Sequence, residues 1–501
     1  MSKKPPTSSA EASSMPVKNY PKFKEPYRSH YHFTPPEKWM NDPNGLVFYN
    51  NTYHLFYQYY PGDIVWGPMH WGHATSKDLI SWKHQPIALY PDEHGLIFSG
   101  SAVMDLKNTS GFGQPEKPAM VAIFTYHLMA GEKASRNDYQ TQGIAYSLDE
   151  GQTWTKYDGN PIISNSGIKD FRDPKVFWHE PSQKWIMVLV AGDHAKIYNS
   201  ANLKEWTHLS DFGKHQGAHG GVWECPDLFP LQVAGTNQTN WVLLVSINPG
   251  APNGGSGTQY FVGDFDGNTF TSNQKETLWI DYGTDNYAGV TYNGLSNDQR
   301  TFIGWMSNWN YARDTPTEVW RSAMTLPRKL TLHKNKNEYY VKNYPIASAK
   351  SYEGNPIVLP AIPGGNSIAA DALQQSRIQF EITDGTKDFS IAFSNDQGEI
   401  YSLNYNASKG LIYTDRSKSG QIDFEASFGK GTHEAPLMAD VHQPLTVTIH
   451  LDASSIESFI NEGATVLTDQ VFPNVPYNQI QFNGEGVNFK NIEIANIASI
   501  W

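Results

Sequence analysis

Cysteine is almost absent from the sequence, which has one, Cys225, among 501 residues. A single cysteine excludes an intrachain disulfide. Long apolar runs are also missing, because runs such as KWIMVLVAG are far shorter than the roughly 20 residues of a membrane-spanning helix. Positive charge is in deficit, with 38 Lys and Arg against 50 Asp and Glu and a net charge of −12. Since nucleic acids require a basic surface, this balance argues against such a partner.

Aromatic residues are abundant, with 15 Trp, 27 Tyr and 24 Phe making up 13% of the chain. Many of these rings belong in a hydrophobic core. The same rings also suit a sugar-binding protein, because their flat faces cover sugar C–H groups and their polar tips form hydrogen bonds. The composition therefore favours a neutral substrate over a charged one.

The sequence opens with a polar stretch, MSKKPPTSSAEASSMP, in which we recognise no signal peptide. We expect residues 1–26 to form a disordered leader. This leader resembles the spacer of a mature bacterial lipoprotein, with Met1 in place of the lipidated cysteine. On that interpretation the protein is secreted or attached to the cell envelope, through a lipid anchor at its native N-terminus. The alternative is an irregular cytoplasmic N-terminus.

Residues 27–345 contain a weak internal repeat that predicts a five-bladed β-propeller. A short strand, a polar turn and an aromatic residue recur in segments that end at Trp82, Trp154, Trp206 and, in degenerate form, Phe270. The surrounding sequence is rich in paired apolar strands and carries no sustained 3.6-residue period. Repeats of this size in an all-β chain are typical of propeller blades, which pack on their neighbours and close into a ring.

The pattern changes after residue 345, where apolar and polar residues alternate between Gly, Asn and Asp turns. This alternation predicts a β-sandwich over 346–501. We expect 351–367 to be a connecting loop. The final strand, in NFKNIEIANIASIW, is expected to dock the C-terminus. The predicted fold is thus all-β, a propeller followed by a sandwich.

Three acidic motifs directly precede apolar strands of the predicted blades: MNDPNG with Asp42, FRDP with Asp173 and WECPD with Glu224. Each alone has a structural explanation, since Asp-Pro is a common turn and Arg-Asp pairs are usually solvated. Because repeated blades are superimposable, equivalent loops should meet at one mouth of the central channel. We therefore expect the three carboxylates to converge in one pocket.

Clustered carboxylates beside aromatic rings favour glycoside hydrolysis, which needs no metal or cofactor. One acid attacks the anomeric carbon or activates water, and another protonates the leaving oxygen. An aspartate, with its lower ordinary pKa, suits the ionised role, whereas a glutamate among aromatic rings suits the acid whose pKa must rise. Arg172 would keep Asp173 ionised.

These motifs, in this order, resemble the three signatures of glycoside hydrolase family 32, the family of invertases, inulinases, levanases and fructan β-fructosidases. The resemblance extends over the chain from about Tyr27 and is closest to bacterial levanases and exo-acting fructanases. It also includes the segments PMHWGHATSKDLISW, IFSGSAV, GTQYFVGDFDG, DYGTDNYAGV and GWMSNWNYA. The fold of this family is a five-bladed propeller followed by a β-sandwich, as the repeats predict.

The resemblance implies a role for each matching residue. Asp42 would be the nucleophile, Glu224 the general acid and base, and Asp173 the stabiliser of the transition state. A retaining mechanism follows, with the Asp42 and Glu224 carboxyls roughly 5–5.5 Å apart. The positions that match substrate contacts are Asn41, Gln58, Trp66, Phe98, Ser101, Arg172, Tyr287 and Trp305.

Several alternatives stay open within this chemistry. Exo action, which releases fructose from the chain end, is favoured by the resemblance over endo action, and the preference between β-2,6 and β-2,1 linkages is undecided. Fructosyl transfer would share the same covalent intermediate. A non-catalytic fructan-binding propeller is disfavoured because the full acid set is present. We expect a monomer whose partner is a fructan or fructooligosaccharide.

Three other sequence features could suggest metal, thiol or phosphate chemistry, but their surroundings argue against it. His215 and His219 are four residues apart, but the glycines around them argue against a zinc-binding helix. The sequence near Cys225 offers no paired histidine to activate a thiol, so a packed thiol is expected. The GGSG at 254–257 lacks the lysine and helix of a phosphate-binding loop.

Overall fold

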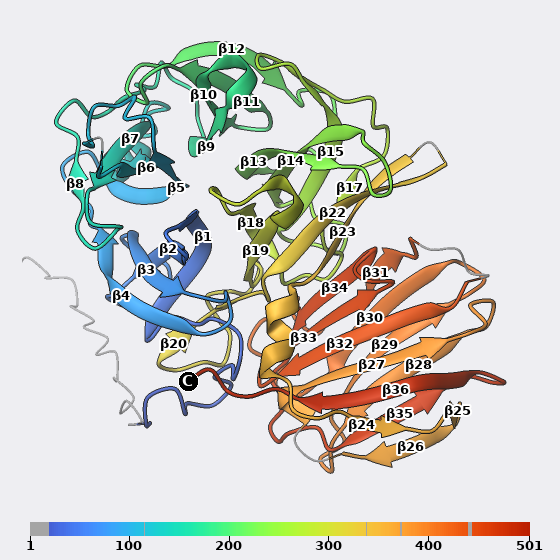
Figure 1. The fold of residues 1–501 in the computed structure, drawn as a ribbon. Helices are drawn as coiled ribbons and strands as arrows, with labels where there is room; N and C mark the ends of the chain where they lie inside the picture. The colour runs from blue at the N-terminus through green and yellow to red at the C-terminus, as the bar shows by residue number, and fades with distance from the viewer. Residues whose placement is uncertain (1–19, 115, 337, 371–372, 439–442) are drawn as a thin grey trace, which may run out of the picture.

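The structure, a computed structural model, describes residues 20–114, 116–336, 338–370, 373–438 and 443–501. Within these residues the chain forms seven sheets, five in a ring and two packed face to face beside it (Figure 1). Among the described helices, none is long and apolar enough to cross a membrane. The helices are α1 (Met129–Lys133) and the 3-10 turns η1 (Glu180–Ser182), η2 (Asn297–Gln299), η3 (Ala347–Tyr352) and η4 (Leu373–Gln375).

Each sheet of the ring is one blade, and the chain crosses it from the centre outward. The first and second blades are β1 (Lys38–Tyr49), β2 (Thr52–Tyr60), β3 (His70–Ser76), β4 (Trp82–Leu89), then β5 (Leu96–Asp105), β6 (Ala119–His127), β7 (Gln140–Ser147), β8 (Thr155–Lys156). The third and fourth are β9 (Phe171–His179), β10 (Lys184–Ala191), β11 (Ala195–Ser200), β12 (Thr207–Phe212), then β13 (Val222–Gln232), β14 (Thr239–Asn248), β15 (Gly257–Phe265), β16 (Phe270–Thr271), β17 (Leu278–Trp279). The fifth is β18 (Tyr287–Thr291), β19 (Thr301–Met306), β21 (Ala323–Met324), β22 (Arg328–Asn335), β23 (Glu338–Pro345), while β20 (Trp320–Arg321) joins β1. The predicted propeller is confirmed.

The repeated aromatic residue marks the turn between the third and fourth strands of a blade. The indole N–H of Trp82 donates to the carbonyl of Leu79 at 3.1 Å. Trp154 and Trp206 make the same bond to the carbonyl three residues earlier, at 3.1 and 3.0 Å. The repeat that is visible in the sequence is therefore one local structure used in successive blades.

The hydrophobic cores lie between neighbouring blades. One cluster joins Phe56 and Trp71 of the first blade to Phe124 of the second, and another joins Ile186 of the third to Leu243 of the fourth. Similar clusters join the second blade to the third, the fourth to the fifth, and the fifth to the first. Because each blade buries its apolar faces only against its neighbours, the ring must close to complete its core.

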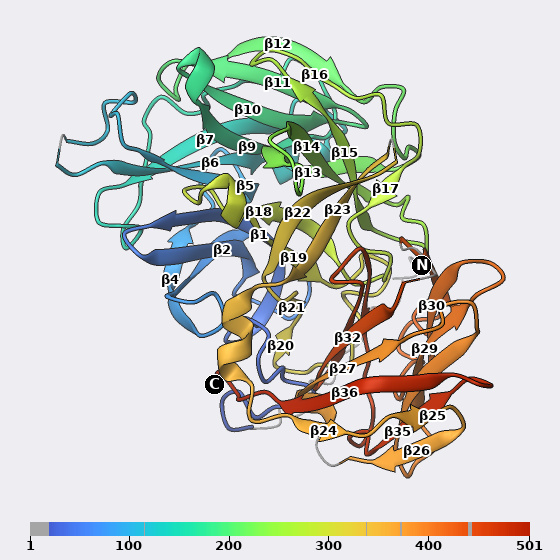
Figure 2. The ribbon, with the colours of Figure 1, turned by 45° about the vertical axis from the view of Figure 1, so that its right-hand side comes forward.

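The two remaining sheets form the predicted β-sandwich. One holds β24 (Ile357–Leu359), β25 (Ile362–Pro363), β27 (Ser376–Ile382), β32 (Leu445–Asp452), β33 (Ser455–Ile460), β34 (Thr465–Gln470) and β36 (Asn488–Asn496). The other holds β26 (Asn366–Ala369), β28 (Phe389–Ser394), β29 (Ile400–Asn406), β30 (Leu411–Lys418), β31 (His433–Pro436) and β35 (Gln479–Asn483). Figure 2 shows the sandwich beside the fifth blade, and β34 contacts β19.

Two details differ from the sequence prediction. The segment 351–367, expected to be a loop, contains β24 and β25, which pair with β36. The sequence pattern did not predict these short edge strands, because Ile357 and Val358 are both exposed and their strand lacks an alternation of buried and exposed residues. Residues 1–19 of the predicted leader lie outside the described residues, but its end is packed: Phe23 stacks on Trp501 with 4.3 Å between ring centroids.

Candidate active site

The inner strand of each blade contains a break in register near its start. These β-bulges fall in β1, β5, β9, β13 and β18. A bulge leaves a residue outside the ladder and re-aims the neighbouring side chains. The polar residues at or beside the five bulges are Asp42, Ser99, Asp173, Glu224 and Tyr287.

A cavity of about 560 Å³ lies where these inner strands begin. It brings together the three predicted acids, from the first, third and fourth blades. Its other lining residues are Asn41, Gln58, Trp66, Phe98, Ser99, His127, Met129, Glu132, Tyr139, Gln140, Asp170, Arg172, Asn248, Trp309, Asn310 and Arg313. Carboxylates and aromatic rings thus line one space, as the repeats predict.

Asp42 is held by three donors. The Ser99 hydroxyl donates to Oδ2 at 2.6 Å, and the Asn41 amide donates to Oδ1 at 2.9 Å. The thiol of Cys225 is 3.5 Å from Oδ2. Burial, followed by the nearby charge of Glu224, raises the pKa of Asp42 above its usual range, and these three donors oppose that rise. Donors on both oxygens suit a carboxylate that acts in its ionised form.

Asp173 is buried, and its backbone adopts a left-handed conformation with φ of 63°. The Cys225 N–H donates to its Oδ2 at 3.0 Å, and the Arg172 Nε lies 3.9 Å from the same oxygen. Burial and the charges of Glu224 and Asp42 outweigh the opposing effect of Arg172 and raise the pKa of Asp173 to about 7, so Arg172 does not by itself keep this carboxylate ionised, contrary to the prediction from the sequence.

Glu224 is fixed by two groups that come from different blades. The Arg172 guanidinium donates to Oε1 at 3.0 Å, and the Tyr287 hydroxyl donates to Oε2. The Glu224 side chain keeps 20% of its surface exposed, against 5% for Asp173, so it faces the open part of the cavity. This position suits an acid that must reach both a leaving group and incoming water.

Cys225 lies between the acids and connects them. Its N–H holds Asp173, and its sulfur is 3.5 Å from Asp42 Oδ2 and 3.6 Å from Asp173 Oδ2. Burial and these carboxylates raise the pKa of the thiol well above its usual range. Cys225 is therefore a protonated donor rather than a nucleophile, consistent with the packed thiol expected from the sequence.

Three predicted substrate contacts do not line the cavity. The Ser101 hydroxyl donates to the Pro174 carbonyl and accepts from the Val176 N–H, both at 2.9 Å, so it joins β5 to β9 below the site. Trp305 is fully buried behind Trp309, with 4.9 Å between ring centroids. Tyr287 is also buried and reaches the site only through its bond to Glu224.

Two residues that line the cavity instead, Ser99 and Trp309, were not predicted from the sequence. Ser99 stands two positions before Ser101 in the same IFSGSAV segment, and Trp309 follows Trp305 in GWMSNWNYA. The bulge between Ile97 and Gly100 decides which serine faces the cavity, and no feature of composition marks it. The loop that carries α1 adds Met129, Glu132 and Tyr139, with no recognisable motif.

The aromatic part of the cavity wall is a packed group. Trp66 meets Phe98 edge to face at 6.1 Å, and Phe98 stacks on His127 at 4.2 Å. His127 is fixed in turn by Glu132 and Gln140, each at 3.1 Å. Such a rigid aromatic surface is suited to cover the apolar face of a sugar ring.

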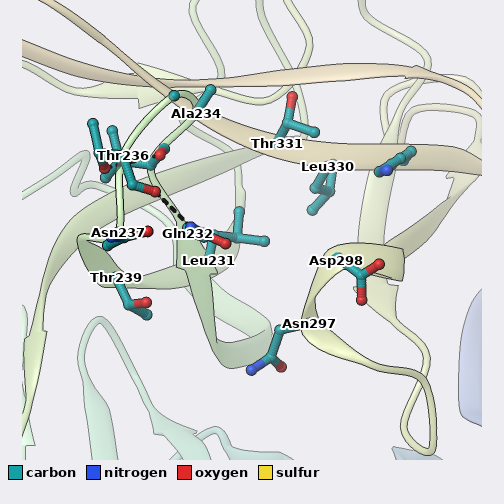
Figure 3. A pocket seen from close by; sticks show the side chains of 13 residues that line it. Leu231, Gln232, Ala234, Thr236, Asn237, Thr239, Asn297, Asp298, Leu330 and Thr331 are labelled. Carbon is teal, nitrogen blue, oxygen red and sulfur yellow. Dashed lines mark hydrogen bonds between the residues drawn. The ribbon is translucent and has the colours of Figure 1, made fainter.

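A second hollow, of about 590 Å³, lies at the opposite end of β13 (Figure 3). It is lined by exposed side chains such as Gln232, Thr236 and Asn297, has Asp298 as its acid, and contains no aromatic ring. Eight residues along β13 separate Gln232 from Glu224, which corresponds to roughly 25 Å. This hollow therefore lacks the chemistry of the acid-lined cavity.

Metal binding is not indicated by the side chains. Among the described residues, no group of three or more His, Cys, Asp and Glu is arranged to hold a metal ion. His219, one of the two histidines considered in the sequence, instead pairs with Asp193 at 3.1 Å.

Comparison with known proteins places both domains in one family. The model of the glycosyl hydrolases family 32 N-terminal domain matches residues 32–343, and that of the family 32 C-terminal domain matches 346–496. The chain belongs to glycosyl hydrolase family 32. This family 32 chain is therefore a glycoside hydrolase, as its carboxylates and its sequence motifs predict.

Individual relatives extend over almost the whole family 32 chain. A levanase of Bacillus subtilis is 45% identical over 494 residues, which cover 96% of this chain and 72% of the relative. An extracellular exo-inulinase of Aspergillus niger is 42% identical over 96% of both chains. The crystal structure of an exo-inulinase from Aspergillus awamori has a TM-score of 0.88 at 38% identity, covering 96% of this chain and all of that one.

Proposed function

We propose that the protein is a retaining β-fructosidase that releases fructose from the ends of β-linked fructans. The observation that carries this proposal is the Asp42 carboxylate, held by three donors in the cavity that also contains Glu224 and Asp173. The names of the relatives, levanase and exo-inulinase, support the substrate class and exo action. A related β-fructofuranosidase of Schwanniomyces occidentalis, with a TM-score of 0.85, was solved with fructosyl-erythritol.

The first step joins the enzyme to the sugar. Asp42 attacks the anomeric carbon of the terminal fructose while Glu224 gives a proton to the departing glycosidic oxygen. In the second step Glu224 takes a proton from water, which attacks the same carbon and releases Asp42. The Ser99 and Asn41 hydrogen bonds hold Asp42 in place throughout.

Asp173 binds the sugar and Arg172 positions the acids. The Asp173 carboxylate accepts hydrogen bonds from fructose hydroxyls, and these bonds strengthen as positive charge develops on the ring. Arg172 contacts Asp170, Asp173 and Glu224, so it keeps the acids at fixed separations. Trp66 and Phe98 pack against the ring of the bound sugar.

Product analysis tests the proposal. The protein would be incubated with high-mass levan, inulin and sucrose in parallel, and early products separated by chromatography. Fructose as the only early product is the expected result, and the three rates give the linkage preference. A ladder of oligosaccharides would indicate endo action instead of exo action. No release of sugar from any of the three substrates would refute the β-fructosidase assignment.

The stereochemistry has a separate test. A retaining enzyme passes its covalent fructosyl group to methanol as well as to water, giving methyl β-fructofuranoside. Products formed in dilute methanol would be examined by NMR. The β-anomer is expected, and the α-anomer would exclude a covalent bond to Asp42. The share of glycoside formed with sugar acceptors measures how far the enzyme acts as a transferase.

We infer a site of action outside the cytoplasm. The relative named an extracellular exo-inulinase supports secretion. The lipid anchor and the monomeric state stay predictions of the sequence. Membrane fractionation of the source cells tests the anchor, and light scattering of the purified protein tests the monomer.

A further inference from the structure

A buried arginine of the sandwich reaches across the domain boundary into the propeller. Arg416 lies in β30 and is 2% exposed. Its NH1 donates to Asp285 Oδ2 at 2.7 Å, and its NH2 donates to the Tyr311 hydroxyl at 2.9 Å. The remaining donors meet the backbone carbonyls of Phe428 at 2.8 Å and Gln470 at 3.1 Å. Every nitrogen of the guanidinium thus has a partner, which fixes its plane.

The two propeller partners are joined to each other. The Tyr311 hydroxyl lies 2.8 Å from Asp285 Oδ1, and both residues are almost fully buried. The Gln470 N–H of the sandwich also donates to Asp285 Oδ2, at 2.9 Å. Arg416, Asp285 and Tyr311 therefore form a closed triangle of hydrogen bonds, which we call the boundary triad.

Each propeller member of the boundary triad lies next to a part of the active site. Tyr311 is in the loop after β19, and its neighbours Asn310, Trp309 and Arg313 line the cavity. Asp285 lies two residues before Tyr287, whose hydroxyl contacts Glu224. One sandwich arginine thus holds both a wall of the cavity and the strand that orients Glu224.

A second cluster of side chains across the boundary does not reach the loop of Trp309. Arg328 of the propeller pairs with Glu457 of the sandwich at 2.7 Å and with Asp281 at 2.9 Å. Arg328 also donates to Thr468 of the sandwich, and Asp281 also accepts a hydrogen bond from Asn286, at 3.1 Å. This second cluster joins the domains without touching the loop of Trp309.

We propose that Arg416 is a positioning residue for the active site, so that the sandwich shapes the substrate cavity as well as bracing the propeller. The inference rests on the proposed β-fructosidase function. Without the boundary triad, the loop 308–313 keeps the bonds of Asn308 to Thr284 and of Trp309 to Ser256 but loses its buried bond to Arg416, so Trp309 is held less firmly in the wall. Substrate binding should weaken more than the chemical step slows, because Asp42 and Asp173 keep their own hydrogen bonds and Glu224 keeps its bond to Arg172.

The test uses two variants in the full chain. Tyr311→Phe removes only the hydroxyl and keeps the ring on Phe428, 5.0 Å away between centroids. Arg416→Lys keeps the charge but cannot bond to both partners in the same fork. We expect KM for inulin and sucrose to rise about tenfold in each, with a smaller loss in kcat, because small misplacements of binding groups cost this much or more. The double variant should lose less than the product of the two single losses.

Arg377→Lys is the matched control. Arg377 is a buried arginine of β27 in the same sandwich, paired with Glu353 at 2.9 Å and Glu493 at 3.1 Å, and neither partner lies near the cavity. Its replacement should lower Tm and leave KM unchanged. An equal rise in KM would mean that any loss of sandwich stability disturbs the site, which would overturn the specific role of Arg416.

Hydrogen exchange gives a readout that needs no activity. Amides of 306–314 should exchange faster in Tyr311→Phe and Arg416→Lys than in the wild type, and should not change in Arg377→Lys. Unchanged exchange of these amides in Tyr311→Phe and Arg416→Lys would overturn the inference even if the enzyme cleaves fructans. A wild type that cleaves no fructan, with faster exchange in the two variants, would instead refute the proposed function and leave the positioning role supported.

Discussion

Replacing Ser99 with alanine tests how Asp42, the proposed nucleophile, is kept ionised. The Ser99 hydroxyl donates the shortest of the three bonds to Asp42, at 2.6 Å, and the serine is 5% exposed. Burial raises the pKa of Asp42, and this hydroxyl opposes the rise. Because the bond stabilises the carboxylate and not the carboxylic acid, its loss must raise the pKa further.

The size of the shift follows from the strength of the bond. A hydrogen bond to a charged group contributes about 1.5–3 kcal/mol, and about 1.36 kcal/mol corresponds to one pKa unit. Asn41 and Cys225 stay on the carboxylate in Ser99→Ala, so the smaller value applies. We expect the pKa of Asp42 to rise by about one unit.

The assay is the pH dependence of kcat/KM with sucrose or inulin. The acid limb of this profile reports the free enzyme, in which, by the proposed mechanism, Asp42 must lose its proton before it attacks. The limb should move to higher pH by about one unit in Ser99→Ala. Ser101→Ala is the control on the same strand, because its hydroxyl bonds only to the backbone of β9. An acid limb that stays in place, or that moves equally in the control, would refute the role given to Ser99.

Other substitutions test the remaining roles. Asp42→Asn should nearly abolish turnover with no change in Tm, and near wild-type activity would exclude it as the nucleophile. Glu224→Gln should slow natural fructans far more than an activated aryl fructoside, whose leaving group needs little protonation, and equal losses would count against the acid role. Burial disfavours the charged form of His32, but hydrogen bonds to Asp452 and Glu457 raise its pKa to about 9 from an ordinary value of 6.5. Stability from this shift is complete below pH 6.5 and is lost as the pH rises toward 9, so urea unfolding should show a decline that His32→Gln abolishes.

The fold could be predicted because its signals are local and repeated. Trp82, Trp154 and Trp206 each bond to a carbonyl three residues earlier, so one short pattern reports one blade. Once the blades are known, their topology brings the inner strands together, and with them Asp42 and Glu224. The convergence of the acids is thus a consequence of repetition rather than of any single motif.

The parts of the site that the sequence did not predict depend on contacts between distant segments. Which serine of β5 faces the cavity is decided by a bulge whose partner strand is β6. Trp309, rather than Trp305, forms the wall, and its backbone N–H donates to the distant Ser256 hydroxyl at 3.2 Å, while our proposal adds the anchor of Tyr311 in the sandwich. The Arg416–Asp285 pair in that anchor joins residues 131 positions apart in the chain. No periodicity or propensity within one segment carries such information.

The same bulges explain how one ring can be both a packed core and an active site. A regular inner strand would place alternate side chains between the blades, where a polar group needs a partner, as Lys175 and Asp227 have in each other at 3.1 Å. Asp173, Cys225 and Ala288 adopt left-handed backbone conformations at or beside their bulges, with φ of 63°, 47° and 54°. Such conformations cost energy for residues other than glycine and persist only where the surroundings enforce them. The closed ring supplies that enforcement, since each bulged strand is held between two interblade cores. Carboxylates such as Asp42, Asp173 and Glu224 can therefore stand near the start of their inner strands, while the rest of each strand continues to pack.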